Sequence, residues 1–154
     1  MIELKPHRYS DGETPLSGWL AMPETSPRAS ILVFPTIANL TPRVGEKAAM
    51  LARMGYIAFV ADYYGDALSG GDAQGLAASL RKDSAAYRQR LGSALDAMRA
   101  LPEARQLPRA AIGFCMGGQA ALEMARAGHD LAAVVSFHGL LETSAPAQPG
   151  DRII

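Results

Sequence analysis

The single cysteine of the chain, Cys115, lies in a sequence context that suits a nucleophile. The segment AIGFCMGGQAALEMA places it between a short apolar run and a helix-forming segment, with Gly113 and Gly117 on either side. This is the pattern G-x-Nu-x-G, in which a sharp strand-to-helix turn holds the nucleophile clear of the backbone. The turn needs small neighbours because strand and helix approach closely there. We therefore predict that Cys115 is a catalytic nucleophile; the alternative is a buried core cysteine.

Two backbone N–H groups are candidates for holding the negative oxygen that forms when a nucleophile attacks an acyl group. The N–H of Met116 begins the helix after Cys115, where the helix terminus favours negative charge. The second donor is expected in the loop FPTIANLTP, after the first buried strand. Ile37 is our choice there, with Thr36 and Ala38 as alternatives. An ordinary proline-bounded turn is the competing interpretation of this loop.

The elements that must position these residues follow from hydrophobic patterning. Residues 2–9 and 16–22 flank an Asp11-Gly12 turn, which predicts an N-terminal hairpin. Beyond it, apolar runs that suit strands buried on both faces alternate with segments of helical periodicity. The expected strands are 29–34, 56–61, 109–114 and 131–137, and the expected helices are 44–54, 73–101 with a break near Asp83, and 117–127. Short links between them predict a mostly parallel sheet covered by helices on both faces.

The pattern breaks off at its C-terminal end. Ile153 and Ile154 look like the start of another strand, whereas single α/β domains commonly run to roughly 200–250 residues. We therefore interpret residues 1–154 as one domain that is incomplete at its C-terminus. The strand at 131–137 would then have an open apolar edge, so we expect dimers or aggregates.

Composition excludes several classes of function. Lys plus Arg (15) equals Asp plus Glu (15), so no net field attracts nucleic acid or a membrane surface. No apolar run approaches the roughly 18 residues of a membrane span, and the N-terminus lacks the pattern of a secretory signal. One cysteine and three scattered histidines form no recognisable metal site. We expect a cytoplasmic protein without metal or cofactor.

The motifs together resemble the dienelactone hydrolase family. LVFPTIANLTPRVGEKAAMLARMGYIAFVADYYGD, GFCMGG and AAVVSFHG follow one another as in that family, from the hairpin onward. The resemblance implies an α/β-hydrolase sheet of eight strands and a Cys–His–Asp triad. It also implies metal-independent hydrolysis of cyclic or activated carboxylic esters. The matching nucleophile is Cys115, and the matching oxyanion amides belong to Ile37 and Met116.

Two departures from the family pattern affect the site. The family has a glutamate just before the residue matching Ile37, where it interacts with the resting thiol, but this chain has Thr36. We expect Thr36 to face the substrate and the substrate range to differ. The family's Asp and His follow the strand that Ile153 begins, so both would lie beyond Ile154. A nucleophilic thiol still needs a base or a cationic neighbour.

Other side chains are expected near the same sheet edge. His138 ends the strand beside the nucleophile's strand; we expect a hydrogen-bonded group that contacts substrate, with a catalytic base as the alternative. Tyr63 and Tyr64 end another strand and are expected to line the cleft. Arg81 lies where the resemblance places contacts to substrate carboxylates, but RKD within a helix is more often a solvated face, so Arg81 is not among the predicted site residues. The remaining histidines are expected to be structural: His7 and His129.

The function that best unites these residues is hydrolysis of a small-molecule ester or lactone through a thioester on Cys115. Two alternatives remain open. A glutamine-amidotransferase-like thiol enzyme also carries a G-x-C-x-G turn on a parallel sheet, although the hairpin and the DYYG turn argue against it. The other alternative is a catalytically inactive fragment that only folds or self-associates.

Overall fold

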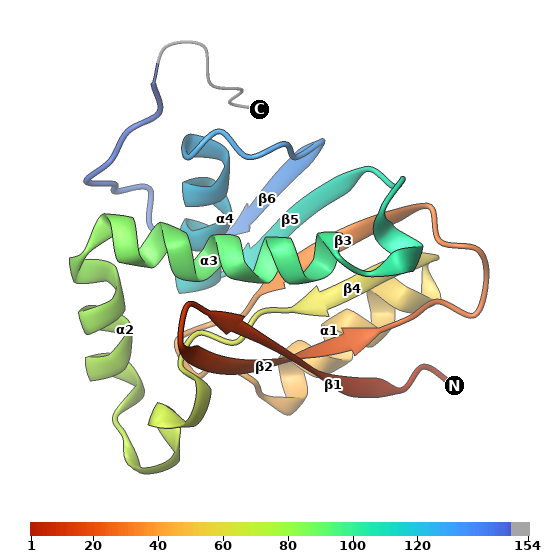
Figure 1. Ribbon diagram of the computed structural model, residues 1–154, viewed down its shortest axis with the longest axis horizontal. Helices are drawn as coiled ribbons and strands as arrows, with labels where there is room; N and C mark the ends of the chain where they lie inside the picture. The colour runs from red at the N-terminus through yellow and green to blue at the C-terminus, as the bar shows by residue number, and fades with distance from the viewer. Residues whose placement is uncertain (149–154) are drawn as a thin grey trace.

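Six strands form one mixed sheet in the order β1-β2-β4-β3-β5-β6 (Figure 1). The structure is a computed structural model, and it describes residues 1–148. The predicted strand start at Ile153 and Ile154 therefore lies outside the described residues. The strands are β1 (Leu4–Asp11), β2 (Thr14–Ala21), β3 (Ala29–Phe34), β4 (Tyr56–Val60), β5 (Arg109–Phe114) and β6 (Ala133–Phe137).

The N-terminal hairpin is confirmed, and it forms one edge of the sheet. β1 and β2 pair antiparallel, with Asp11 opposite Thr14 at the turn. β2 then pairs antiparallel with β4, where Trp19 lies opposite Val60. The hairpin thus extends a parallel sheet without being part of the strand–helix alternation.

The four remaining strands are parallel, as their apolar runs predict. β3 is the most central of them, between β4 and β5, and Leu32, Val33 and Phe34 at its end are fully buried. β6 pairs only with β5 among the described strands, and its residues alternate between exposed and intermediate. It begins at Ala133, two residues later than predicted, and Leu131 before it is buried in the larger core.

Helices cover both faces of the sheet (Figure 1). On one face, α1 (Pro42–Arg53) buries Val44, Ala48 and Leu51 against Val33 and Val60. On the other face, α3 and α4 pack over β3, β4 and β5, with Leu91 and Met124 in the larger core. The helices of that side are α2 (Ala73–Lys82), α3 (Ser84–Arg99) and α4 (Met116–Arg126), with short 3-10 turns η1 (Gly65–Gly70) and η2 (Pro102–Ala104).

The predicted break near Asp83 is confirmed. Asp83 ends α2 and caps α3, because its carboxylate accepts hydrogen bonds from the N–H groups of Ala85 and Ala86. Such capping satisfies donors that have no partner within the helix. The turn η1 was not expected; it forms inside the polar, glycine-rich stretch that the sequence indicates only as a loop.

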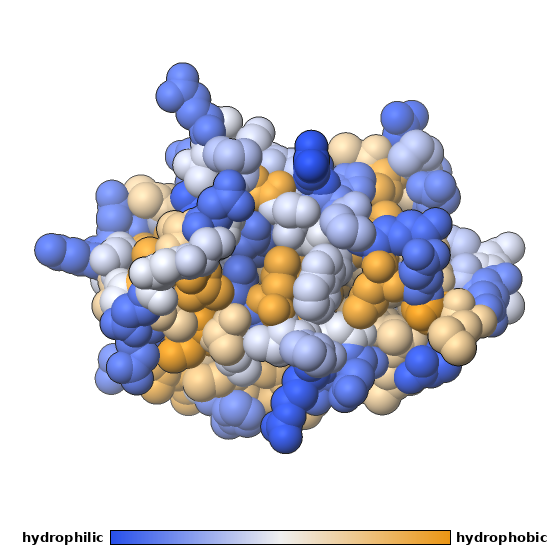
Figure 2. Space-filling model, turned by 90° about the horizontal axis from the view of Figure 1, so that it is seen from below, coloured by the Kyte–Doolittle hydropathy of each residue, from blue (hydrophilic) through white to orange (hydrophobic). Residues whose placement is uncertain are grey.

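Exposed apolar residues are mostly dispersed over the surface. Figure 2 shows the molecule from below, where apolar residues appear as several separate areas among polar ones. Within residues 1–148, no helix has the length and apolar character needed to cross a bilayer.

Candidate active site

Cys115 occupies a sharp turn between the end of β5 and the start of α4. Its φ of 56° and ψ of −119° lie outside the regions that non-glycine residues favour. The surrounding backbone fixes this conformation: the Cys115 N–H donates to the Phe137 carbonyl at 2.9 Å, and the Cys115 carbonyl accepts from the Gly118 N–H at 2.9 Å. The residue itself is exposed. The turn therefore holds the thiol out from the sheet edge.

The glycines around Cys115 allow strand and helix to approach each other. A Cβ atom added at Gly113 would lie 1.7 Å from the Gly117 carbonyl oxygen, and one added at Gly117 would lie 2.1 Å from the Phe34 carbonyl oxygen. Neither separation is possible for real atoms, so the close packing of β3, β5 and α4 requires glycine at both positions. This is the physical reason for the G-x-C-x-G pattern.

The first turn of α4 provides a site for negative charge beside the thiol. It contains no acidic residue, and among the described residues the Met116 N–H has no hydrogen-bond acceptor. Unpaired N–H groups at a helix start carry partial positive charge and favour an anion. The geometry is thus compatible with Met116 as an oxyanion donor, although the role stays a prediction.

The loop after β3 packs against the same turn and carries Ile37. Residues 36–39 form a turn in which the Asn39 N–H donates to the Thr36 carbonyl at 3.0 Å. Because the peptide unit is planar and trans, the Ile37 N–H points away from that carbonyl. No acceptor for it occurs among the described residues. The Ile37 carbonyl accepts from the Tyr64 hydroxyl at 3.0 Å, and this hydrogen bond anchors the loop to the segment after β4.

Thr36 and Ala38 occupy different positions in this turn. The Thr36 hydroxyl oxygen accepts from the Ala38 N–H at 3.3 Å, so Ala38 is less suited than Ile37 to donate to a ligand. Thr36 thus makes a local turn contact at the position where the family pattern has a glutamate.

The described part of the chain contains no group of three or more His, Cys, Asp or Glu side chains that could hold a metal ion.

A buried polar network joins the loops after β3 and β4. Asp62 is 4% exposed, and its carboxylate accepts hydrogen bonds from the Asn39 side chain at 2.8 Å and the Ser17 N–H at 2.9 Å. The same carboxylate accepts from the N–H groups of Tyr64 and Gly65. Sequence reasoning missed Asn39. The signal available was an asparagine in a turn, a residue that tolerates the left-handed region found here.

The two tyrosines after β4 have different places. Tyr64 is nearly buried and holds Ile37; burial raises its pKa to about 12. Tyr63 is fully buried, and its hydroxyl donates to the Pro35 carbonyl at 2.7 Å. Burial raises the pKa of Tyr63 as well. Tyr63 thus supports the loop from inside, which corrects the expectation that it lines the cleft.

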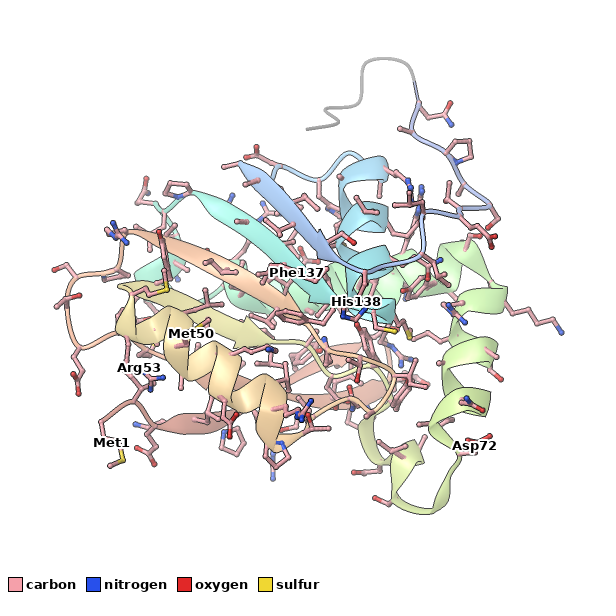
Figure 3. All side chains as sticks on the ribbon, turned by 180° about the vertical axis from the view of Figure 1, so that it is seen from behind. Met1, Met50, Arg53, Asp72, Phe137 and His138 are labelled. Carbon is pink, nitrogen blue, oxygen red and sulfur yellow. The ribbon has the colours of Figure 1, made fainter. Side chains whose placement is uncertain are left out.

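His138 is the histidine that lies beside the nucleophile's strand. It follows Phe137, whose carbonyl accepts from the Cys115 N–H, and both are labelled at the end of β6 in Figure 3. It is exposed, with a φ of 41°. The other histidines make packing contacts: His7 lies edge-on to Phe59, and burial lowers the pKa of His129, which packs near Gly92.

A pocket of about 520 Å³ lies between α2, α4 and the segment after β6. Arg81 lines it and contacts the Gln119 side chain, which also donates to the Glu142 carbonyl at 3.2 Å. The Arg81 Nε atom and the Tyr87 hydroxyl are buried without a hydrogen-bond partner among the described residues. Arg81 is therefore not the solvated surface residue that its sequence neighbours indicate.

Comparison with known proteins agrees with this geometry. A structure called m3DLH is 36% identical over 96% of this chain and 62% of its own, with a TM-score of 0.83. The dienelactone hydrolase-like promiscuous phosphotriesterase P91, from metagenomic libraries, is 37% identical over 93% of this chain and 62% of its own, also with a TM-score of 0.83. A dienelactone hydrolase from Anabaena variabilis, 23% identical over 90% of this chain and 64% of its own, shares the fold with a TM-score of 0.68.

The chain thus spans about 62% of the length of the first two structures. No curated protein matches the sequence. The dienelactone hydrolase family matches residues 16–153, which includes every element of the site described above. With its α/β-hydrolase sheet and this match over most of its length, the chain belongs to the dienelactone hydrolase family.

Proposed function

We propose that this chain carries the nucleophile and the oxyanion site of a carboxylic ester or lactone hydrolase. The observation that carries the proposal is the conformation of Cys115: a left-handed residue, exposed at the sheet edge, with the start of α4 beside it. A core cysteine requires neither feature. Membership of a hydrolase family adds the reaction class.

In the proposed reaction the Cys115 thiolate attacks the acyl carbon of the substrate. The carbonyl π electrons move to oxygen, and the N–H groups of Met116 and Ile37 hold the resulting oxyanion. The oxyanion then collapses, the bond to the leaving oxygen breaks, and that oxygen takes a proton as the alcohol departs. Water hydrolyses the thioester, which releases the acid and restores the thiol.

The base for this reaction is expected outside the described residues. Within residues 1–148 no side chain is hydrogen-bonded to the Cys115 thiol. We infer a histidine oriented by an acid from another part of the polypeptide, as in the family triad. His138 is the alternative, because its strand neighbours β5.

Two substrate classes fit the site. A carboxylic ester is the first, with its carbonyl oxygen at the N–H groups of Met116 and Ile37; the Tyr64 hydroxyl anchors the Ile37 carbonyl. A phosphotriester is the second, because a relative that is 37% identical is described as a promiscuous phosphotriesterase. A phosphoryl oxygen could occupy the same pair of N–H donors.

The test measures acylation of the 154-residue protein by p-nitrophenyl acetate. We expect a burst of nitrophenol equal to the protein concentration, then little turnover, with the acetyl group on Cys115 by peptide mass spectrometry. Cys115→Ala should lose the burst, since removing a catalytic nucleophile typically costs several powers of ten. A burst that survives Cys115→Ala would contradict the proposal. Steady turnover that disappears in His138→Ala would identify His138 as the base, and ammonia release from glutamine would favour the amidotransferase alternative.

A further inference from the structure

A pocket of about 700 Å³ lies on the hairpin side of the molecule, and Cys115 is not among the residues that line it. Its floor is one face of the hairpin, where Pro6 lies opposite Trp19 and Arg8 lies opposite Ser17. Directly opposite residues of an antiparallel pair share a face, so these four side chains lie on the same side of the two strands. We call this cavity the hairpin pocket.

The walls of the hairpin pocket are the residues just before α1 and the turn η1, which lies beside β2 (Figure 1). Asp62 holds both walls to the floor. Its carboxylate accepts from the Ser17 N–H of the hairpin at 2.9 Å and from the Asn39 side chain at 2.8 Å. It also accepts from the Gly65 N–H at the start of η1, at 3.0 Å. The hairpin pocket is therefore pre-formed, as ligand sites usually are.

Two opposite charges line the hairpin pocket without a partner. The Arg8 guanidinium and the Asp66 carboxylate are both exposed, and within residues 1–148 neither takes part in a hydrogen bond or an ion pair. The Asp62 carboxylate, in contrast, already accepts four hydrogen bonds. Asp66 would repel a purely anionic ligand, and Arg8 would repel a purely cationic one. A ligand that carries one charge of each sign matches both side chains.

Apolar side chains supply much of the remaining lining. Pro6 and Trp19 belong to the floor, and Leu40 and Leu68 belong to the walls. Apolar surface with a few polar groups is typical of small-molecule sites, whose volumes run from about 300 to 1,000 Å³. The hairpin pocket is thus large enough for a ligand with an apolar body between its two charged ends.

We propose that the hairpin pocket binds a short peptide with free ends and apolar side chains, of the size of a dipeptide. The peptide carboxylate pairs with the Arg8 guanidinium, its ammonium group pairs with the Asp66 carboxylate, and its side chains lie against Trp19 and Leu68. Because Arg8 and Asp66 form no ion pair with each other, the two ligand charges must also be apart. They are farther apart in a dipeptide than in a single amino acid. Since Cys115 does not line this pocket, binding there is independent of the proposed function.

Isothermal titration calorimetry of the 154-residue protein with L-leucyl-L-leucine tests the proposal. The exposed Cys115 is first alkylated with iodoacetamide, so that binding at the nucleophile does not contribute. We expect saturable binding of one dipeptide per chain. Arg8→Gln and Asp66→Asn should each raise the Kd by about tenfold, the effect of losing one hydrogen-bonded charge. The matched controls Lys5→Gln and Glu13→Gln, at exposed hairpin positions outside the pocket, should leave the Kd unchanged.

Blocked dipeptides assign each charge to its partner. N-acetyl-leucyl-leucine lacks the ammonium group and should bind about tenfold more weakly, and Asp66→Asn should then cause no further loss. Leucyl-leucinamide lacks the carboxylate and should also bind about tenfold more weakly, with no further loss in Arg8→Gln. Losses that instead add up in both combinations would contradict these pairings.

Backbone NMR locates the bound dipeptide. The amide signals of Leu40, Gly65 and Leu68 should shift during the titration, because these residues line the pocket. Shifts confined to residues around Cys115 would overturn the proposal. So would the absence of saturable binding up to about 10 mM dipeptide, where a site with a millimolar Kd is largely occupied. L-leucine that binds as tightly as the dipeptide would overturn the choice of a peptide as the ligand.

Discussion

The loops that follow β4 and β6 end at the same edge of the sheet but are held very differently. After β4, residues 62–65 are fixed by the buried carboxylate of Asp62, which accepts four hydrogen bonds from side-chain and backbone N–H groups. After β6, His138 is exposed in a left-handed conformation, and Leu140 and Leu141 are 52% and 74% exposed. We refer to these as the closed side and the open side of the site.

The difference separates a part of the site that internal hydrogen bonds hold from a part that few internal contacts hold. The closed side positions the loop that carries Ile37, the proposed oxyanion donor: the Tyr64 hydroxyl donates to the Ile37 carbonyl, and the Asp62 carboxylate accepts from the Tyr64 N–H. The open side has few internal contacts to position a base, and its apolar residues face outward. Electrostatic stabilisation of an oxyanion needs preorganised donors, and the rigid backbone of the closed side suits the role proposed for Ile37. The open side instead exposes apolar side chains at the surface beside the Cys115 turn.

The largest expected effect comes from disrupting the turn around Cys115, which lies between the closed side and the open side. Gly113→Ala would place a methyl carbon 1.7 Å from the Gly117 carbonyl oxygen, so β5 and α4 must separate. We expect the free energy of unfolding to fall by at least about 4 kcal/mol, the range of severe core disruption. Urea denaturation measures it. Gly70→Ala, where an added Cβ meets nothing within 4 Å, is the control and should change stability by less than about 0.5 kcal/mol.

Removing the carboxylate of the closed side should have the next largest effect. Asp62→Ala leaves the Asn39 amide and the Ser17 N–H without their acceptor in a buried place. We expect a loss of about 3 kcal/mol, because each buried unpaired donor costs about 1–3 kcal/mol. Asp66→Asn, at an exposed position four residues later, should be close to neutral. Equal stability of the two variants would mean that the closed side is not held by Asp62.

A pH titration tests the Tyr64 contact. Burial raises the folded-state pKa of Tyr64 from 10.0 to about 12, so the unfolded chain loses this proton first as pH rises. The stabilisation is therefore complete below pH 10 and is lost between pH 10 and about pH 12. Tyr64→Phe should show a shallower loss of stability across that window than the unmodified protein. Thermal unfolding at a series of pH values measures this loss. If stability fell equally with pH in both proteins, the raised pKa of Tyr64 would be refuted.

The smallest effect is expected on the open side. Phe137→Ser removes a half-exposed ring that stacks on Phe114 and should cost about 0.5–1.5 kcal/mol, the contribution of such ring pairs. A cost of several kcal/mol would contradict the half-exposed position of this ring.

Local sequence patterns predicted the features that depend on neighbours along the chain. The strands β3 to β5 follow from continuous apolar runs, and the Cys115 turn follows from glycine spacing. The residues of the Asp62–Asn39 contact are 23 positions apart in the sequence. Glu123 of α4 forms ion pairs with Arg126 of the same helix and with Arg88 of α3, so it joins the two helices. No local pattern specifies such contacts, because they depend on how the elements pack. The burial of Tyr63 was missed for the same reason.

The order of the strands has a consequence for where the site lies. After β3 the chain continues to β4 on one side, and it later crosses back to β5 on the other side of β3. The connections that leave β3 and β5 therefore run in opposite directions, by way of α1 and α4 on opposite faces. Such a topological switch point opens a crevice beyond the carboxyl ends of the two strands. Cys115 and the loop with Ile37 flank it, so the path of the backbone alone selects this place for a ligand.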